Sequence, residues 1–513
     1  MLTRLHSLTS GWRAPVLALL AGALAVPAFA PWGLWPLVLP SLLLLYWLLQ
    51  EQTPRRSALL GFSWAFGLNM PGLWWIHVSM TAFGGIPLAV AFLLVGGLAA
   101  YLALYPTLAC YLLGRYFPRG GAVRHLLALP ALWLLSDWAL GHVLTGFPWL
   151  WLGYSQLDSP LIGWAPLLGV QGITLALLLS IGALLVAWQQ RRLPWLLLPL
   201  LLWGGGALLR GHAWTSPGKT LDFALVQGNI AQSAKWDPNN IKPTLLRYLD
   251  MSRPHNEADV VIWPESAVPA LENEMEPFLT NLDATMRDNQ TGFITGIQYL
   301  DPQQRRFYNG VIGMGLIDEA GQQHYQYATG NRYYKRHLVP IGEFVPFGEL
   351  LRPLAPFFNL PMSSFSRGDM IQPNVVVHGA RFAPSICYEM AFSDELRQNV
   401  HADTDYILTV SNDSWFGTSH GPWQHMAITR MRAIEFGKPV IRATNSGVTV
   451  AFDAQGKELG RLPQFEQQVL RVKVPSASGE TPYNRIGSWP LLLWVAAALL
   501  SAFGLSGAFR RRR

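Results

Sequence analysis

The sequence has few charged residues for its length. Only 13% of its 513 residues are Asp, Glu, Lys or Arg, about half the usual share in soluble proteins. The shortage is uneven, because residues 14–50, 57–114, 193–209 and 488–509 contain none of these four types. A bilayer core is crossed by roughly 20 consecutive apolar residues in a helix. These stretches therefore exclude an ordinary soluble protein and predict membrane-spanning helices.

Cysteine is also rare in the sequence. The chain has two cysteines: Cys110 lies inside the charge-free stretch 57–114, and Cys387 follows the apolar run 381–386 in a polar region. A disulfide needs Cα atoms within about 7 Å, so a cysteine in a membrane helix does not pair with one in a polar domain. We expect Cys387 to be an unpaired thiol, either a nucleophile or a small buried apolar side chain.

The net charge of +7 does not predict a nucleic-acid partner, because the positive charge lies beside the apolar stretches. Residues 1–210 hold ten Arg and three acidic residues, and residues 510–513 add four Arg. Residues 211–487 are left with 24 basic and 28 acidic side chains, a net charge of −4. A nucleic-acid-binding domain carries clustered positive charge instead. We expect no nucleic acid among the partners.

The apolar stretches, with Gly, Pro and Arg as punctuation, predict eight transmembrane helices. We place them near residues 12–30, 33–50, 57–78, 86–114, 125–145, 162–188, 193–210 and 488–508. The chain then divides into a seven-helix domain at 1–213, a polar domain at 220–475, and a last helix with a basic tail at 486–513. Residues 1–30 also resemble a signal peptide, but Pro31 directly after its Ala-Phe-Ala site disfavours cleavage, so we expect a retained helix.

Arginines beside the helices predict the orientation of the chain in the membrane. With eight helices the arginines in the short loops and at the termini all fall on one side: Arg4, Arg13, Arg55, Arg56, Arg115, Arg119, Arg124, Arg191, Arg192 and Arg510 to Arg513. Loops rich in arginine stay in the cytoplasm. We therefore expect both termini in the cytoplasm and residues 211–487 on the outer side.

The polar domain alternates short apolar runs with amphipathic segments, which is typical of an α/β domain. We expect strands at 220–227, 259–263, 292–299, 307–316, 381–386, 405–411, 439–453 and 468–474. We expect helices near 242–252, 274–288, 390–400 and 422–437.

Three of the apolar runs lead to a chemically active side chain. Glu265 follows Trp-Pro in VVIWPESAVP, Lys335 follows two tyrosines in NRYYKRHLVPIGE, and Cys387 stands in RFAPSICYEM. A partly desolvated carboxylate suits a base, a desolvated ammonium an oxyanion stabiliser, and a thiol at a strand-to-helix turn a nucleophile. Taken alone, each has an ordinary alternative: a turn glutamate, a solvated charge cluster or a buried cysteine. Together they supply the parts of one thiol-dependent site.

The order of these residues resembles the nitrilase superfamily, whose catalytic triad is Glu-Lys-Cys. WPES with Glu265, YYKRHLVPIGE with Lys335 and ICYE with Cys387 carry the resemblance, and SNDSWFG at 411–417 is placed as a matching motif. With seven preceding helices and one following, the whole chain resembles the apolipoprotein N-acyltransferase family. The resemblance implies a polytopic α-helical membrane domain joined to a nitrilase-like αββα sandwich. It also implies supporting roles for Trp236, Glu343, Tyr388 and Glu389.

The resemblance implies an acyl transfer in two steps, without a cofactor. Cys387 would take an acyl chain from the sn-1 ester of a phospholipid, such as phosphatidylethanolamine, as a thioester. The N-terminal amine of a diacylglyceryl-cysteine on an apolipoprotein would then accept the chain. Glu265 would act as the base and Lys335 would stabilise the oxyanion. We expect no metal, because His420 and His425 are five residues apart without a further cluster of ligands.

Residues 344–365 are rich in proline and apolar side chains for a loop outside the membrane. We interpret this loop as a lid that dips into the lipid interface; the ordinary alternative is a surface loop that folds back on its own domain. The side chains expected along the substrate path are Phe357, Phe358, Trp415 and Phe416.

The resemblance places the enzyme in the bacterial inner membrane, with the catalytic domain in the periplasm, and we expect a monomer. A membrane-tethered amidase or nitrile hydrolase with the same triad is an alternative, distinguished by passing the acyl group to water. A transporter with an accessory domain is another, but it predicts several charges within the membrane spans, where the sequence places only Asp137.

Overall fold

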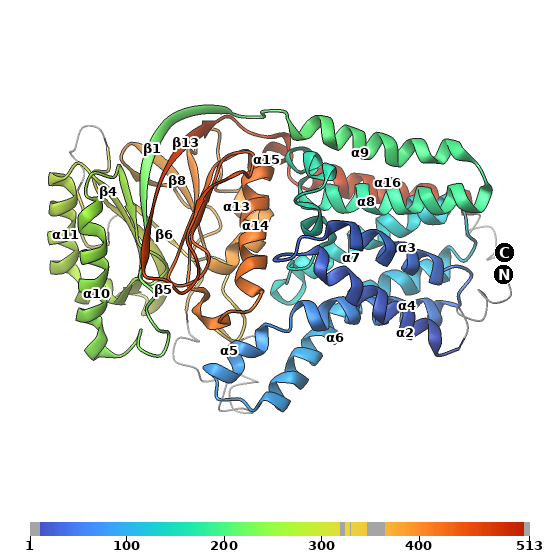
Figure 1. The fold of residues 1–513 in the computed structure, drawn as a ribbon, viewed down its shortest axis with the longest axis horizontal. Helices are drawn as coiled ribbons and strands as arrows, with labels where there is room; N and C mark the ends of the chain where they lie inside the picture. Colours follow the sequence, from blue (N-terminus) through green and yellow to red (C-terminus); the bar gives the residue numbers. More distant parts are fainter. Residues whose placement is uncertain (1–10, 319–323, 329, 346–364, 507–513) are drawn as a thin grey trace. The chain divides into compact units, whose positions relative to one another are not determined.

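The computed structural model describes residues 11–318, 324–328, 330–345 and 365–506. The chain divides into two compact units, and both sheets belong to the second (Figure 1). The helical unit comprises Met1–Thr81, Gly85–His212 and Arg485–Arg513. The catalytic unit comprises Ala82–Gly84 and Ala213–Asn484.

The helical unit contains a helix in each of the eight stretches expected to span the membrane. Five helical segments are long and apolar enough to cross a bilayer: Leu88–Tyr116, Val123–Thr145, Pro160–Gln190, Leu193–Arg210 and Trp489–Ser506. Two more apolar segments, Arg13–Ala28 and Trp35–Leu48, are shorter. These helices support a membrane protein, while the count of eight spans stays a prediction.

The main helices of this unit follow the apolar stretches closely. They are α2 (Arg13–Ala25), α3 (Val38–Leu48), α4 (Pro54–Gly72), α6 (Leu88–Tyr116), α7 (Leu129–His142), α8 (Ala165–Gln190), α9 (Leu197–Arg210) and α16 (Trp489–Ser506). The stretch expected as the third span is divided: α4 ends at Gly72, directly after Pro71, and the short helix α5 (Ile76–Ala82) follows. Proline lacks the N–H that an uninterrupted helix would need at this point.

Glycines allow α2 and α4 to pack closely. Gly22 of α2 lies against the backbone of Trp64, and Gly67 of α4 lies against the backbone of Leu19. A Cβ atom at either glycine would overlap main-chain atoms of the other helix. Small residues serve this purpose in membrane helices, where close van der Waals contact replaces the hydrophobic effect.

The catalytic unit contains two sheets. The first has the order β13-β1-β2-β4-β5-β6, with β3 paired to β4 beside this path. Its strands are β1 (Ser216–Gln227), β2 (Val260–Ile262), β3 (Val268–Leu271), β4 (Gly292–Asp301), β5 (Arg306–Gly315), β6 (Arg332–Tyr334) and β13 (Gln468–Ser478). The second has the order β12-β11-β10-β9-β8-β7. Its strands are β7 (Val375–Val377), β8 (Ala380–Ile386), β9 (Tyr406–Ser411), β10 (Val440–Thr444), β11 (Val450–Phe452) and β12 (Glu458–Arg461).

Both sheets have a parallel centre and antiparallel edges. Strands β1, β2 and β4 run parallel in the first sheet, and β8, β9 and β10 run parallel in the second. Ligand sites in such sheets lie beyond the carboxyl ends of the parallel strands. Glu265 follows the carboxyl end of β2, and Cys387 follows that of β8, so each sheet presents one reactive side chain at this position.

The two sheets pack face to face around an apolar core. Phe223 and Ile262 from the first sheet and Phe382, Tyr406 and Leu408 from the second belong to one buried cluster. The rings of Phe223 and Tyr406 meet edge to face, with their centroids 5.1 Å apart. Aromatic pairs of this kind add to the free energy gained by burial alone.

Helices cover the outer face of each sheet, which completes the expected αββα sandwich (Figure 1). The helices α10 (Pro238–Ser252) and α11 (Glu276–Asp288) cover the first sheet, where Leu279 packs with Trp263 and Phe293 in a second buried cluster. The helix α14 (Gly421–Phe436) covers the second sheet.

Some elements differ from the sequence prediction. The run 439–453 is two strands, β10 and β11, because the chain turns sharply between them beside Asp413, where a Cβ atom at Gly447 would overlap that side chain. The helix expected at 390–400 is shorter: a 3₁₀ turn at Cys387–Ala391 precedes α13 (Ser393–Arg397). Strands β1 and β13 pair from Ser216 with Ser478, a few residues beyond the expected strand boundaries at 220 and 474.

Candidate active site

The backbone of Cys387 is strained at the point where β8 ends. Its φ angle is +54°, in the left-handed region that a side chain with a Cβ atom rarely adopts. A non-glycine residue held there costs on the order of 1–3 kcal/mol, and such strain is concentrated at functional sites. The thiol is partly buried and forms no disulfide; Cys110 is likewise free and is buried in the helical unit.

Glu265 is held by main-chain and side-chain donors from three other parts of the sequence. Its Oε1 accepts a hydrogen bond from Nδ2 of Asn309 at 2.8 Å, and its Oε2 accepts one from the backbone N–H of Asn412 at 3.0 Å. Its backbone carbonyl accepts a hydrogen bond from Nζ of Lys235 at 2.9 Å. Glu265 is only 8% exposed, so these donors fix the position of a buried carboxylate.

Lys335 joins two carboxylates. Its Nζ donates to Oε1 of Glu343 at 2.8 Å and lies 3.6 Å from Oε1 of Glu265. Burial lowers the pKa of Lys335, but Glu343, Glu265 and Cys387 more than offset this effect, so the pKa lies above its ordinary value. The ammonium is therefore charged at neutral pH and can donate hydrogen bonds to a developing oxyanion.

The thiol of Cys387 faces both charges. Burial and the charge of Glu265 raise its pKa and Lys335 lowers it, and the net result is a pKa of about 12. At neutral pH the resting side chain is therefore a thiol rather than a thiolate. A nucleophile in this state needs a base, and Glu265 is the carboxylate that interacts most strongly with it. The structure thus brings Glu265, Lys335 and Cys387 together from three distant parts of the sequence.

Glu343 and Glu389, both expected as supporting residues, make different contacts. Glu343 accepts from Lys335 through Oε1 and from the backbone N–H of Val339 through Oε2 at 2.9 Å. Glu389 accepts at Oε2 from the backbone N–H of Ile386 at 2.6 Å, directly before Cys387. Its Oε1 accepts three hydrogen bonds from the chain beside Lys335: from the hydroxyl of Tyr333 and from the backbone N–H groups of Arg336 and His337.

Glu389 therefore connects the turn that carries the thiol to the segment that carries the ammonium. Burial raises the pKa of Glu389 to about 7, although the hydrogen bonds from Ile386 and His337 act in the opposite direction. Tyr388 is buried, and its ring meets the ring of Phe392 at a centroid distance of 5.1 Å. Trp236 is partly buried and lies 5.8 Å from Nζ of Lys235.

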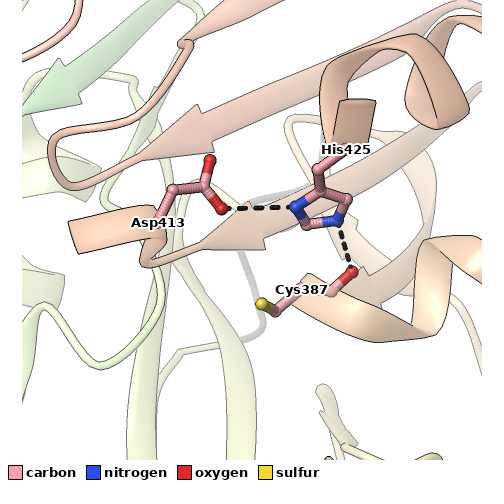
Figure 2. Close-up of side chains that lie close together, drawn as sticks. All are labelled: Cys387, Asp413 and His425. Atoms are coloured by element: carbon pink, nitrogen blue, oxygen red, sulfur yellow. Dashed lines mark hydrogen bonds and ion pairs between the residues drawn. The ribbon is translucent and has the colours of Figure 1, made fainter. Parts of the chain in front are cut away.

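A polar network behind the thiol was missed by the sequence analysis. Nε2 of His425 lies 2.9 Å from the backbone carbonyl of Cys387, and Nδ1 lies 3.2 Å from Oδ1 of Asp413 (Figure 2). Arg442 donates from Nη2 to Oδ2 of Asp413 at 2.6 Å and lies 3.1 Å from Nδ1 of His425. Asp413, His425 and Arg442 are all buried, so the network is shielded from water.

The same residues meet a distance criterion for metal binding. The thiol of Cys387, the carboxylate of Asp413 and a ring nitrogen of His425 lie within 4.8 Å of one another. The other contacts argue for a different use, because Arg442 already neutralises Asp413 and the carbonyl of Cys387 already engages His425. We therefore assign these side chains to holding the backbone of Cys387.

The residues expected along the substrate path are only partly described. Trp415 and Phe416 lie in a 3₁₀ turn at Asp413–Phe416, and Trp415 is 38% exposed. Phe357 and Phe358 lie outside the described residues. The interpretation of residues 344–365 as a lid stays a prediction from the sequence.

The fold and the cluster of thiol, carboxylate and ammonium define a carbon–nitrogen hydrolase domain. A family model described as "Carbon-nitrogen hydrolase" matches residues 223–483, about half of the chain, and confirms the nitrilase-like fold. A solved carbon-nitrogen hydrolase from Helicobacter pylori G27 aligns with 50% of this chain and 89% of its own, at 14% identity and a TM-score of 0.38.

The helical unit and the full-length relatives make the assignment more specific. A family model described as "Apolipoprotein N-acyltransferase N-terminal domain" matches residues 21–183. The apolipoprotein N-acyltransferase of Vibrio vulnificus (strain CMCP6) is 48% identical over 503 residues, which cover 97% of each chain. The apolipoprotein N-acyltransferase of Shewanella oneidensis is 45% identical over 502 residues, which cover 95% of each chain. The chain belongs to the apolipoprotein N-acyltransferase family.

Proposed function

We propose that this enzyme moves an acyl chain from a membrane phospholipid to the N-terminal amine of a lipoprotein, through a thioester on Cys387. Membership of the family supports the reaction class. The observation that carries the chemistry is the position of the Lys335 ammonium, 3.6 Å from Glu265 and close enough to Cys387 to lower the pKa of its thiol.

The first half-reaction acylates the enzyme. Glu265 takes the proton of the thiol as Sγ of Cys387 attacks the carbonyl carbon of the phospholipid ester, at the sn-1 position in this proposal. The carbonyl oxygen becomes an oxyanion that accepts a hydrogen bond from Lys335. The intermediate collapses with cleavage of the ester C–O bond, Glu265 returns its proton to the leaving oxygen, and a lysophospholipid departs.

The second half-reaction removes the acyl group from the enzyme. The N-terminal amine of a diacylglyceryl-cysteine attacks the thioester carbonyl, and Glu265 takes a proton from the attacking nitrogen. The C–S bond breaks, Sγ recovers the proton from Glu265, and an amide-linked chain is left on the lipoprotein. One carboxylate thus serves both half-reactions, because each begins with deprotonation of a nucleophile and ends with protonation of a leaving group.

Transfer to a lipid-anchored amine, rather than to water, is favoured by the apolar helices that the chain carries. The five long apolar helices would hold the catalytic unit at a bilayer, where the acyl chains of both substrates reside. We propose phosphatidylethanolamine as the donor, a diacylated apolipoprotein as the acceptor, and a monomeric enzyme. A water-dependent amidase with the same three residues would need no such attachment.

Mass spectrometry of the purified full-length protein tests the covalent step. After incubation with phosphatidylethanolamine, Cys387 should carry an acyl adduct that hydroxylamine releases. Cys387→Ala should abolish the adduct, while Cys110→Ala should leave it unchanged. A diacylglyceryl-cysteine peptide should discharge the adduct, and the same peptide with an acetylated N-terminus should not. An enzyme that transfers acyl chains while Cys387 stays unmodified would contradict the mechanism.

The orientation of the chain is part of the proposal. We place both termini in the cytoplasm and the catalytic unit in the periplasm of a bacterium, on the basis of the arginines beside the helices. Alkaline phosphatase, which is active only in the periplasm, should be active when fused after Ala213 and inactive when fused after Arg191. The reverse pattern would contradict this orientation.

A further inference from the structure

A second buried lysine lies at the site. Lys235 follows β1 in the segment that leads to α10, and its side chain is only 4% exposed. Its Nζ donates one hydrogen bond, to the backbone carbonyl of Glu265 at 2.9 Å. An ammonium has three N–H donors. Among the described residues no carboxylate forms an ion pair with Lys235, which is unusual for a charge at this depth.

The charges around the thiol explain why a second cation is useful. Glu265 and Glu343 share the single ammonium of Lys335, so these three groups together carry one surplus negative charge. A buried negative charge opposes the formation of a second one nearby, and Glu265 does raise the pKa of the Cys387 thiol. A further ammonium at this position makes the set of four charges neutral.

We propose that Lys235 is the charge-balancing residue of the site: its ammonium offsets the surplus carboxylate and so stabilises the negative charge on Sγ of Cys387 and on the oxyanion that follows. This inference rests on the proposed role of Cys387 as the nucleophile. In the first step Glu265 takes the thiol proton, so the negative charge moves from its carboxylate to Sγ. Lys235 gives up no proton and forms no covalent bond; it acts through its charge.

The ionisation of Lys235 is consistent with this role and makes its effect on Cys387 depend on pH. Burial lowers the pKa of Lys235 to about 8, while the two titratable groups that act on it, Glu265 and Cys387, raise it. Lys235 is therefore charged below about pH 8 and loses its charge above it. Arginine in its place would keep the charge throughout this range.

The test measures how fast iodoacetamide alkylates Cys387 in the full-length enzyme in detergent, without lipid, with the modified peptide identified by mass spectrometry. Lys235→Met, which keeps the length of the side chain and removes its charge, should lower the rate at pH 7 by roughly tenfold, the effect of one pKa unit on the thiol. Lys235→Arg should stay within about twofold of the wild type. The matched control is Lys242→Met, which removes an exposed lysine of α10 and should change nothing.

Equal alkylation rates in folded Lys235→Met and in the wild type would overturn the proposal. If Lys235→Met does not fold, the comparison of Lys235→Arg with the wild type between pH 7 and pH 9.5 decides instead. The ratio of the arginine variant's rate to the wild-type rate should rise above pH 8, and a constant ratio would overturn the proposal. Acylation of Cys387 by phospholipid in the wild type tests the proposed role of Cys387 separately. If the wild type forms the adduct but Lys235→Met does not change the alkylation rate, only the role of Lys235 is rejected.

Discussion

The imidazole of His425 and the backbone carbonyl of Cys387 are joined by a hydrogen bond of 2.9 Å. The ring donates this bond, because a carbonyl oxygen can only accept, and its Nδ1 lies 3.1 Å from Nη2 of Arg442 and 3.2 Å from Oδ1 of Asp413. Burial lowers the pKa of His425 and Arg442 lowers it further, so the ring is neutral at physiological pH. In the proposed mechanism His425 is therefore a positioning residue for the strained backbone of Cys387, not its base.

Replacing His425 should slow acylation without changing substrate binding. His425→Ala removes the donor to the carbonyl of Cys387, and a displaced nucleophile can lose about 10²-fold in rate. His425→Gln offers an amide donor and should recover part of the loss. The initial rate of adduct formation measures this effect, with the exposed His401→Ala as control. A general base would behave differently: His425→Gln would then be as inactive as His425→Ala.

Glu265→Gln should make the reactivity of Cys387 depend more steeply on pH. With its pKa raised to about 12, the thiol is almost entirely protonated at pH 7, so in the proposed mechanism the wild-type enzyme depends on proton transfer to Glu265. The variant should form the acyl adduct about 10²- to 10⁴-fold more slowly at pH 7. Because Glu265 also raises the pKa of the thiol, the variant should recover as the pH rises toward 10.

Adduct formation measured from pH 6 to pH 10 checks this prediction. The exposed Glu276→Gln at the start of α11 serves as the control for the loss of one carboxylate. A Glu265→Gln variant whose rate and pH profile match those of the wild type would remove Glu265 from the mechanism.

The close packing of α2 against α4 in the helical unit can be tested by a glycine substitution. Gly67→Ala places a methyl group against the backbone of Leu19, and main-chain atoms cannot move aside as a flexible side chain can. Gly97→Ala on α6 adds the same group where no atom lies within 4 Å. In detergent, Gly67→Ala should lower the unfolding temperature by several degrees, while Gly97→Ala should leave it unchanged or raise it slightly, since alanine favours helix by about 1 kcal/mol. Equal unfolding temperatures would contradict the close packing of these helices.

The architecture could be predicted from the sequence where a pattern runs over many residues. The strands at the core of both sheets, such as β4 and β9, are mainly apolar runs, and most helices of the membrane region lie in long charge-free stretches. Strands β6 and β7 have three residues each, which is too short for an alternating pattern to stand out. Their positions are decided by antiparallel pairing, of β6 with β5 and of β7 with β8, which no pattern within three residues reveals.

The site was predictable only in part, for a similar reason. Glu265, Lys335 and Cys387 stand in recognisable motifs. The motif SNDSWFG includes Asn412 and Asp413, but the sequence does not indicate that they contact Glu265 and Arg442. His425 donates a hydrogen bond to the backbone carbonyl of Cys387, and Lys235 donates one to the backbone carbonyl of Glu265. Neither bond can be predicted from the spacing of residue types. The sequence suggested only a metal-binding role for His425. A side chain that bonds to the main chain requires no particular residue type as its partner, so no motif identifies it.

The buried ion pairs of Lys335 give the last prediction, which separates stability from activity. Lys335→Met leaves Glu265 and Glu343 facing each other without their shared cation, and removing one partner from a buried ion pair costs about 3–5 kcal/mol. Adding Glu343→Gln removes one of the two repelling charges, so the double variant should regain much of the lost stability. Neither variant should form the acyl adduct, because the donor to the oxyanion is missing in both. Thermal unfolding in detergent and mass spectrometry of Cys387 measure the two properties, with the exposed Lys457→Met as control. A double variant that regains acylation together with stability would show that Lys335 has a structural role only.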